Sequence, residues 1–121
     1  MTEVRNNRYA KLAELRADVR RSTVYRLLCC CHTADKVSKE TGMGFRAGYF
    51  FADGEKTEHA WNYDPETDEI VDLTIGQTIL GFPEILIVSR NSEIGRQYMT
   101  FTEWRKSQGK PVYNQSPRIA T

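Results

Sequence analysis

The chain has 121 residues, of which 40% are hydrophobic and 27% are charged, and its formal net charge is +1. This length and composition are typical of a single globular domain spanning residues 1–121, and the near-neutral charge gives no reason to expect a nucleic-acid partner. No apolar run approaches the roughly 20 residues that cross a bilayer, and the first residues lack a signal peptide's apolar core, so we expect a cytoplasmic protein without membrane contact.

The first predicted element is an amphipathic helix over residues 3–20. Larger apolar residues recur there at helical spacing with alanines beside them, and arginines occupy the remaining face. Such a pattern is typical of a helix that buries one side. The residues expected on the apolar side are Tyr9, Leu12, Leu15 and Val19.

A second helix is predicted to end at Gly42, in the run KETGMG, because glycine readily adopts the left-handed conformation that closes a helix. Its start is open. Either Ser22 or Thr23 caps it, or an irregular stretch through VYRLLCC leads to a helix that begins near Cys31. Three cysteines are adjacent in this region, and sequence neighbours do not readily form the spaced bridges of a secreted scaffold, so we expect free thiols.

Three antiparallel strands in a meander are predicted from Gly44 onward. The stretches GFRAGYFFA and TEHAWNY flank a glycine-containing turn, which predicts a hairpin. A second turn, DPET, follows, because Pro65 presets the backbone there and Asp64 can accept a local backbone hydrogen bond. The stretch EIVDLT is therefore expected to fold back beside HAWNY.

Two further strands and a helix are predicted downstream. EILIVS, residues 84–89, is rich in β-branched residues, and RQYMTF can form a fifth strand. Thr102 resembles the cap of a helix over EWRKSQ, which Gly109 and Pro111 are expected to end. We expect residues 110–121 to be a loose tail.

A histidine and an acid lie on either side of the second turn. If Tyr63 pairs with Asp68 around DPET, the same register pairs His59 with Asp72. Directly opposed side chains share a face with β-carbons about 5 Å apart, so the carboxylate can hold an imidazole N–H and fix the tautomer. A slip of one residue would separate them onto opposite faces. Trp61 shares the face of His59, where it either shields the pair from water or packs as plain core.

A cysteine is the natural nucleophile beside an oriented imidazole, because the thiolate is the reactive form. We assign this role to Cys31. A helix that begins near it would lower its pKa through the unpaired N–H groups of the helix terminus, and a protonated His59 would lower it further. Cys29 and Cys30 are then expected to be buried as small apolar residues, and His32 to be exposed.

The order of these motifs resembles the transglutaminase-like superfamily of papain-type cysteine hydrolases and acyltransferases. A cysteine near a helix start, then HAWN, then VDLT and a glutamine are similar to small bacterial and phage-type members, over roughly residues 25–80. The resemblance implies that Cys31 is the nucleophile, His59 the base and Asp72 the residue that orients it. Members often have a glycine just before the cysteine, where this chain has Cys30, so Cys30 remains an alternative nucleophile.

Plainer interpretations exist for the same residues. His59 can be an ordinary strand histidine, and Asp72 can cap the TIGQ turn that follows it. Zinc-compatible ligand types come from Cys29, Cys31, His32 and His59. Neighbours on a helix point about 100° apart, however, which is unlike the spaced ligand pairs of structural zinc sites. A further alternative is a catalytically inactive accessory protein with the same fold.

We therefore expect an α+β domain in which N-terminal helices pack on an antiparallel sheet, with a papain- or transglutaminase-like core. The expected activity is hydrolysis or acyl transfer at an amide bond of a peptide or protein, without cofactor or metal. Cys31 attacks the carbonyl, His59 accepts the thiol proton and later protonates the leaving group, and Asp72 orients His59. The expected oxyanion donor is the backbone N–H of Cys31. Unranked side-chain alternatives for that donor are Asn6, Asn7 and Gln77.

Overall fold

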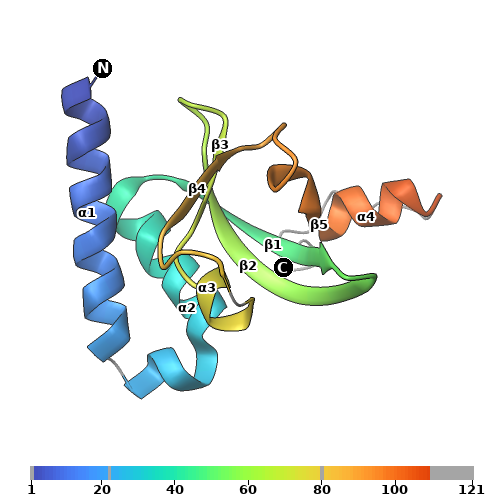
Figure 1. Ribbon diagram of the computed structural model, residues 1–121, viewed down its shortest axis with the longest axis horizontal. Helices are drawn as coiled ribbons and strands as arrows, with labels where there is room; N and C mark the ends of the chain where they lie inside the picture. The colour runs from blue at the N-terminus through green and yellow to red at the C-terminus, as the bar shows by residue number, and fades with distance from the viewer. Residues whose placement is uncertain (1, 22, 80, 110–121) are drawn as a thin grey trace.

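Two long helices precede a five-stranded antiparallel sheet, so the architecture is α+β, as predicted (Figure 1). The computed structural model describes residues 2–21, 23–79 and 81–109, and of these the side chains outside 2–7, 19–29 and 77–78. The predicted tail at 110–121 lies outside the described residues.

The helix α1 (Thr2–Arg21) matches the predicted first helix and buries one apolar stripe. Leu12 and Leu15 lie in this stripe, with 0% and 2% of their surface exposed, as predicted. Tyr9, predicted to face the core, is instead 53% exposed. The side chain of Val19 lies outside the described residues, so its predicted place in the core stays a prediction.

The position of Arg8 explains why Tyr9 is exposed. Arg8 lies one turn before Leu12 on the same side of α1, and it reaches the turn between the second and third strands. Its guanidinium bonds the carboxylates of Asp64 at 2.6 Å and Glu69 at 3.0 Å. Arg8 therefore occupies the sheet-facing position in this turn of α1, and Tyr9, the next residue, faces solvent.

The helix α2 (Thr23–Thr41) ends where the sequence predicts. Gly42 has a φ of 81° and its N–H bonds the carbonyl oxygen of Ser38 at 2.9 Å, so the glycine closes the helix. The start at Thr23 contradicts the alternative in which the helix begins near Cys31, because TVYRLL is itself helical. Figure 1 shows the first turns of α2 running at an angle to the rest of the helix.

The strands form one sheet in the order β4-β3-β2-β1-β5. Their bounds are β1 (Gly44–Ala52), β2 (Glu55–Asp64), β3 (Glu69–Asp72), β4 (Leu86–Ser89) and β5 (Tyr98–Thr100). A two-residue turn joins β1 to β2, where Asp53 and Gly54 have positive φ angles of 52° and 77°. Such turns match the twist of the flanking strands. The predicted first hairpin is confirmed.

The β2–β3 hairpin has a register two residues away from the predicted one. Tyr63 pairs with Ile70 rather than with Asp68. Asp68 lies inside the loop with a φ of 55°, so the loop begins and ends one residue later than DPET. A shift of two residues preserves the face of every side chain, so His59 and Asp72 still share a face, as diagonal rather than direct neighbours.

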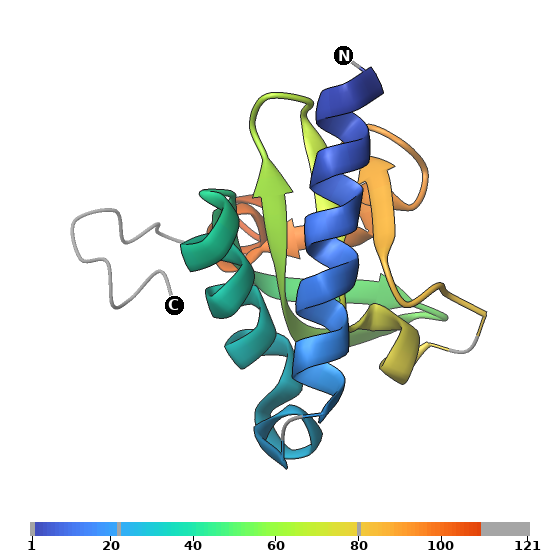
Figure 2. The same ribbon diagram turned by 90° about the vertical axis from the view of Figure 1, so that its left-hand side faces the viewer.

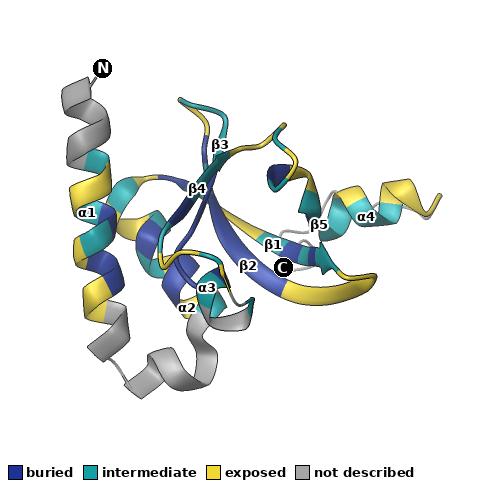
Figure 3. Cartoon of the chain, viewed as in Figure 1, coloured by how far each residue is buried: buried dark blue, intermediate teal, exposed yellow. Residues whose placement is uncertain are grey.

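The two faces of the sheet carry different buried clusters. Figure 2 shows α1 and α2 lying together over one face. The cluster on this helix-covered face comprises Leu12, Leu15, Val37, Met43, Val71 and Leu73. The cluster on the opposite face comprises Phe50, Trp61, Ile70, Ile75, Leu86 and Tyr98. Figure 3 shows that β2 is exposed at its first residues and largely buried from His59 onward.

Two short α-helices and a 3₁₀ helix, η1 (Gly95–Gln97), complete the described fold. The sequence does not predict α3 (Ile75–Thr78), which follows β3 directly. The helix α4 (Phe101–Ser107) is capped by Thr100 rather than by Thr102. The Thr100 hydroxyl accepts the N–H of Glu103 at 3.1 Å, and the Glu103 carboxylate accepts the N–H of Thr100 at 2.8 Å. This reciprocal capping box places the helix start two residues earlier than predicted.

Candidate active site

A histidine and an aspartate lie against each other beside Trp61 and Tyr98 of the second buried cluster. His59 comes from β2 and Asp72 ends β3, and the distance from His59 Nε2 to Asp72 Oδ2 is 2.7 Å. Only 8% of His59 and 1% of Asp72 is exposed. The structure thus brings the predicted pair together. Because Nε2 faces the carboxylate, the other ring nitrogen, Nδ1, is available to a second partner.

The two oxygens of the Asp72 carboxylate have separate partners. Oδ1 accepts the backbone N–H groups of Thr74 at 2.9 Å and Ile75 at 3.0 Å, which fixes the turn into α3. Oδ2 faces His59 and also accepts the hydroxyl of Tyr98 at 2.6 Å. Asp72 therefore caps the turn and contacts the imidazole at the same time. Each of these partners can donate a hydrogen bond, as a buried ionised carboxylate requires.

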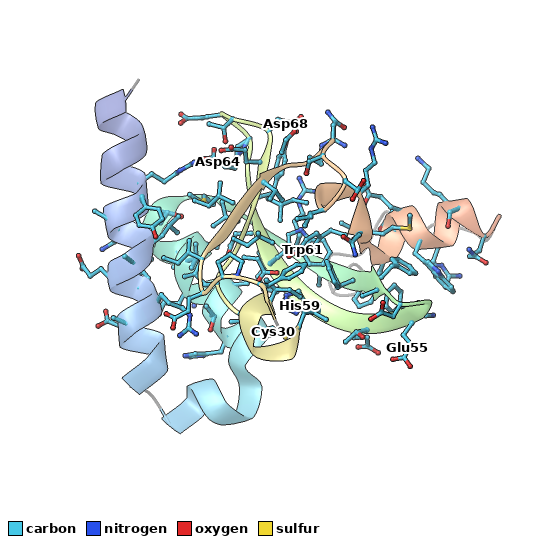
Figure 4. All side chains as sticks on the ribbon, viewed as in Figure 1. Cys30, Glu55, His59, Trp61, Asp64 and Asp68 are labelled. Carbon is cyan, nitrogen blue, oxygen red and sulfur yellow. The ribbon has the colours of Figure 1, made fainter. Side chains whose placement is uncertain are left out.

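The thiol beside His59 belongs to Cys30 and not to Cys31. Figure 4 shows Cys30 on α2 next to His59 of β2. Cys30 is half-buried and hydrogen bonded to His59, whereas Cys31 is exposed. The predicted placement of Cys31 at the site is therefore wrong, and the alternative residue, Cys30, occupies it. The side chain of Cys29, predicted to be buried, lies outside the described residues.

The helical period of α2 explains why Cys30, and not Cys31, lies beside His59. Thr33, Ala34 and Val37 are buried, and they lie three, four and seven positions after Cys30. Residues with that spacing share one side of a helix, so Cys30 lies on the side that faces the sheet. Cys31 is turned about 100° away from it. The buried stripe of α2 is thus the sequence signal that identifies the inward cysteine.

The contacts of the pair favour charge separation between the thiol and the imidazole. Burial alone would lower the pKa of His59, but its hydrogen bonds to Asp72 and Cys30 outweigh burial and raise that pKa to about 9. The hydrogen bond to His59 lowers the pKa of Cys30, and this effect exceeds the opposing effect of burial. A thiolate beside an imidazolium is the form that these two shifts favour at neutral pH.

Two aromatic rings enclose the imidazole. The Trp61 ring stacks on the His59 ring, with centroids 6.2 Å apart and planes at 18°, so the predicted proximity of Trp61 is confirmed. Tyr98 lies 6.3 Å from His59 and 5.0 Å from Trp61, measured between ring centroids. Burial and the charge of Asp72 raise the pKa of Tyr98, so its hydroxyl stays protonated and can donate to Asp72. No local sequence pattern indicates Tyr98 at this site, because its contacts depend on the pairing of β5 with β1.

The expected oxyanion donor loses its basis in the structure. The backbone N–H of Cys31 lies within α2 and not at a helix start. Helix-interior N–H groups normally bond carbonyl oxygens four residues earlier. The side chains offered as alternatives, those of Asn6, Asn7 and Gln77, lie outside the described residues.

The described part of the chain offers no cluster of three His, Cys, Asp or Glu side chains suited to a metal ion. His32, one of the zinc-compatible residues, is exposed, as predicted. Over the same described residues, none of the helices combines the length and apolar character needed to span a membrane.

Comparisons of the chain with protein-family models, with curated proteins and with solved structures found no match. The function is therefore inferred from the chemistry of Cys30, His59 and Asp72 in this fold.

Proposed function

We propose that the protein is a cysteine-dependent hydrolase or acyltransferase of the transglutaminase-like, papain-type class. Cys30 is the nucleophile, His59 the general acid and base, and Asp72 the residue that orients His59. The observation that carries this proposal is the continuous chain of contacts from the Cys30 thiol through the His59 ring to Asp72 Oδ2 at 2.7 Å. A nucleophile, a base and a base-orienting group in this order are the requirement for activated nucleophilic catalysis.

The arrangement of the chain supports the same class. A helix carries the cysteine, and two neighbouring antiparallel strands carry the histidine of HAWN and the aspartate of VDLT. The resemblance to the superfamily implies a papain-like core with these elements in this order. The cysteine lies inside α2 rather than at its start, so the pairing with His59, and not a helix terminus, activates the thiol.

The proposed reaction begins with attack of the Cys30 thiolate on the carbonyl carbon of an amide in a peptide or protein. The His59 imidazolium donates its proton to the departing amine nitrogen, which leaves as the amide bond breaks and a thioester to Cys30 forms. Neutral His59 then removes a proton from water or from an acceptor amine, which attacks the thioester. The acyl group departs as an acid or a new amide, and the Cys30 thiolate is restored beside protonated His59.

The remaining buried groups fit supporting roles. Asp72 fixes the Nε2 side of His59 and stabilises the imidazolium, as the carboxylate of a catalytic triad does. Tyr98 and the backbone N–H groups of α3 hold the carboxylate in place. Trp61 covers one side of the imidazole and reduces its contact with water.

Competitive labelling tests the nucleophile. The folded protein is treated at neutral pH with iodoacetamide below the thiol concentration, and each cysteine is followed by peptide mass spectrometry. We expect Cys30 to be alkylated well before Cys31, although Cys31 is the more exposed side chain. Cys31→Ala should slow the labelling of Cys30 far less than His59→Ala does, because the contact with His59 lowers the pKa of Cys30 more than the contact with Cys31. Equal and slow alkylation of all three cysteines would instead support an inactive accessory protein.

A further inference from the structure

A cavity of about 620 Å³ opens on the same sheet face as His59 and Asp72. Its inner wall includes Trp61 and Tyr98, the two rings that contact the His59 imidazole. Tyr63 and Ile70 continue this wall along β2 and β3. The volume lies in the range of small-ligand and peptide side-chain pockets. A molecule in this cavity would therefore be separated from the catalytic imidazole by one aromatic layer.

The rim of this cavity is rich in arginine. Arg46 of β1, Arg90 after β4 and Arg96 before β5 all line it. The one acidic residue in its lining is Glu103, whose carboxylate already accepts the N–H of Thr100 as part of the α4 capping box. The lining therefore carries an excess of positive charge, although the whole chain is near neutral at +1.

Tyr63 holds two of the three arginines in position. The guanidinium of Arg46 lies over the Tyr63 ring, 4.7 Å from its centroid. The Tyr63 hydroxyl donates to Asp68 at 2.5 Å, and the same carboxylate oxygen accepts Arg90 Nε at 2.9 Å. Figure 4 shows Asp68 at the β2–β3 turn, beyond Trp61 from the catalytic residues. This network orders the rim before any ligand binds, which reduces the entropic cost of binding.

Two of the arginines keep their charge available. Within the described residues, neither Arg46 nor Arg96 forms an ion pair with a carboxylate. Arg90 uses Nε on Asp68, which leaves the other guanidinium nitrogens to a ligand. Planar guanidinium groups bind carboxylate and phosphate oxygens in paired hydrogen bonds. Three such groups around one cavity match an anionic ligand better than a neutral one.

We propose that this arginine-rimmed pocket binds an anionic side chain, a carboxylate or a phosphate, of the peptide substrate. The identification of the ligand as substrate rests on the proposed acyl chemistry at Cys30. The binding itself depends on the arginines and needs no turnover. The pocket thus selects acidic or phosphorylated peptides and positions them beside the wall formed by Trp61 and Tyr98.

Calorimetric titration of the full chain carrying Cys30→Ala tests this binding without reaction. The probes are three blocked pentapeptides with a central glutamine, flanked by glutamates, by phosphoserines or by glutamines. We expect the glutamate or the phosphoserine peptide, or both, to bind at least about tenfold more tightly than the all-glutamine peptide. The peptide that binds more tightly, with glutamates or with phosphoserines, identifies the preferred anionic group as a carboxylate or a phosphate. Equal binding of all three peptides, or no binding, would overturn the proposal.

Charge-matched variants locate the binding to the pocket. Arg46→Gln with Arg96→Gln should remove the preference for the anionic peptide, and Arg96→Gln alone should reduce it. The control is Lys39→Gln with Lys106→Gln, which changes the net charge equally at exposed positions outside the pocket. An equal loss in this control would assign the preference to general charge and contradict the proposal. Circular dichroism of each variant confirms that the fold is retained.

The two proposals fail in different ways. If Cys30 reacts fast but the peptides bind alike, the acyl chemistry stands and the anionic pocket is wrong. If the anionic peptide binds through the arginines but Cys30 is as sluggish as an ordinary thiol, the pocket stands and the acyl chemistry is wrong.

Discussion

The two faces of the sheet bury residues of different kinds. Under α1 and α2 the core is aliphatic, with Leu12, Val37 and Val71 fully buried. On the opposite face, His59 and Asp72 are almost as deeply buried, each with a hydrogen-bonding partner. Burying such groups is costly unless they are paired, so the second face combines its apolar cluster with a paired polar site that the first face lacks. Substitutions on the two faces should therefore have separable effects.

His59→Ala should have the largest effect on reactivity and spare the helix-covered core. Removing the imidazole deprives Cys30 of the hydrogen-bonding partner that lowers its pKa, so the thiolate fraction at neutral pH, and with it the alkylation rate, should fall by about tenfold. The measurement is the rate of Cys30 alkylation at neutral pH, site by site. A His32→Ala control should leave that rate unchanged. An unchanged rate in His59→Ala would mean that the imidazole does not activate the thiol.

Leu12→Ala should lower the stability of the fold and leave the reactivity of Cys30 unchanged. Leu12 is 0% exposed within the helix-covered cluster, so its truncation should lower the free energy of unfolding by about 2–5 kcal/mol. Urea unfolding measures this loss. Under conditions where the variant remains folded, alkylation of Cys30 should proceed at the wild-type rate. A large fall in that rate would show that the two faces are not separable.

The raised pKa of His59 predicts how stability depends on pH. A group whose pKa is raised on folding, here from 6.5 to about 9, stabilises the fold fully below its unfolded pKa and less as pH rises through the folded value. Cys30→Ala removes the opposing titration of the thiol and one of the two hydrogen bonds that raise the pKa of His59, so the shift becomes smaller but keeps its direction through the contact with Asp72. Urea unfolding of that variant should show stability falling from mildly acidic to alkaline pH. Adding His59→Ala to Cys30→Ala should weaken the dependence of the free energy of unfolding on pH over this range.

Tyr98→Phe should have the smallest effect. The change keeps the ring against Trp61 but removes the hydroxyl that donates to Asp72 Oδ2, so the free energy of unfolding should fall by about 1 kcal/mol. Asp72 then has a less satisfied carboxylate, which should raise the pKa of His59 further. The imidazole's titration, followed by NMR, measures this shift. A fall in that pKa would contradict the role assigned to the hydroxyl.

Local turn chemistry made the strands predictable, with one ambiguity. Asp53 and Gly54 offer a single good two-residue turn, and the structure uses it. Around Pro65, both Asp64 and Asp68 suit a turn: Asp64 accepts the N–H of Glu66 as predicted, but Asp68 adopts positive φ and moves the loop by one residue. The pairing of β2 with β3 is therefore shifted by two residues, which leaves His59 and Asp72 on the same face and in contact.

The rest of the site depends on contacts distant in sequence. The inward cysteine is the exception, because the buried stripe of α2 identifies Cys30 once the helix is known to extend back to Thr23. Tyr98 reaches Asp72 only because β5 pairs with β1. Gly48 permits that close pairing, since a β-carbon there would lie 2.1 Å from the carbonyl oxygen of Met99. Such long-range pairing has no short sequence signal.

Titration of the Cys30 thiol tests the central contact most directly. In a variant with Cys29→Ala and Cys31→Ala, the ultraviolet absorbance of the thiolate reports Cys30 alone. We predict a midpoint below the ordinary thiol value of about 8.5, moving up to that value or beyond it when His59→Ala is added. A midpoint at or above the ordinary value with His59 present, and unmoved by its removal, would contradict the pairing of thiol and imidazole.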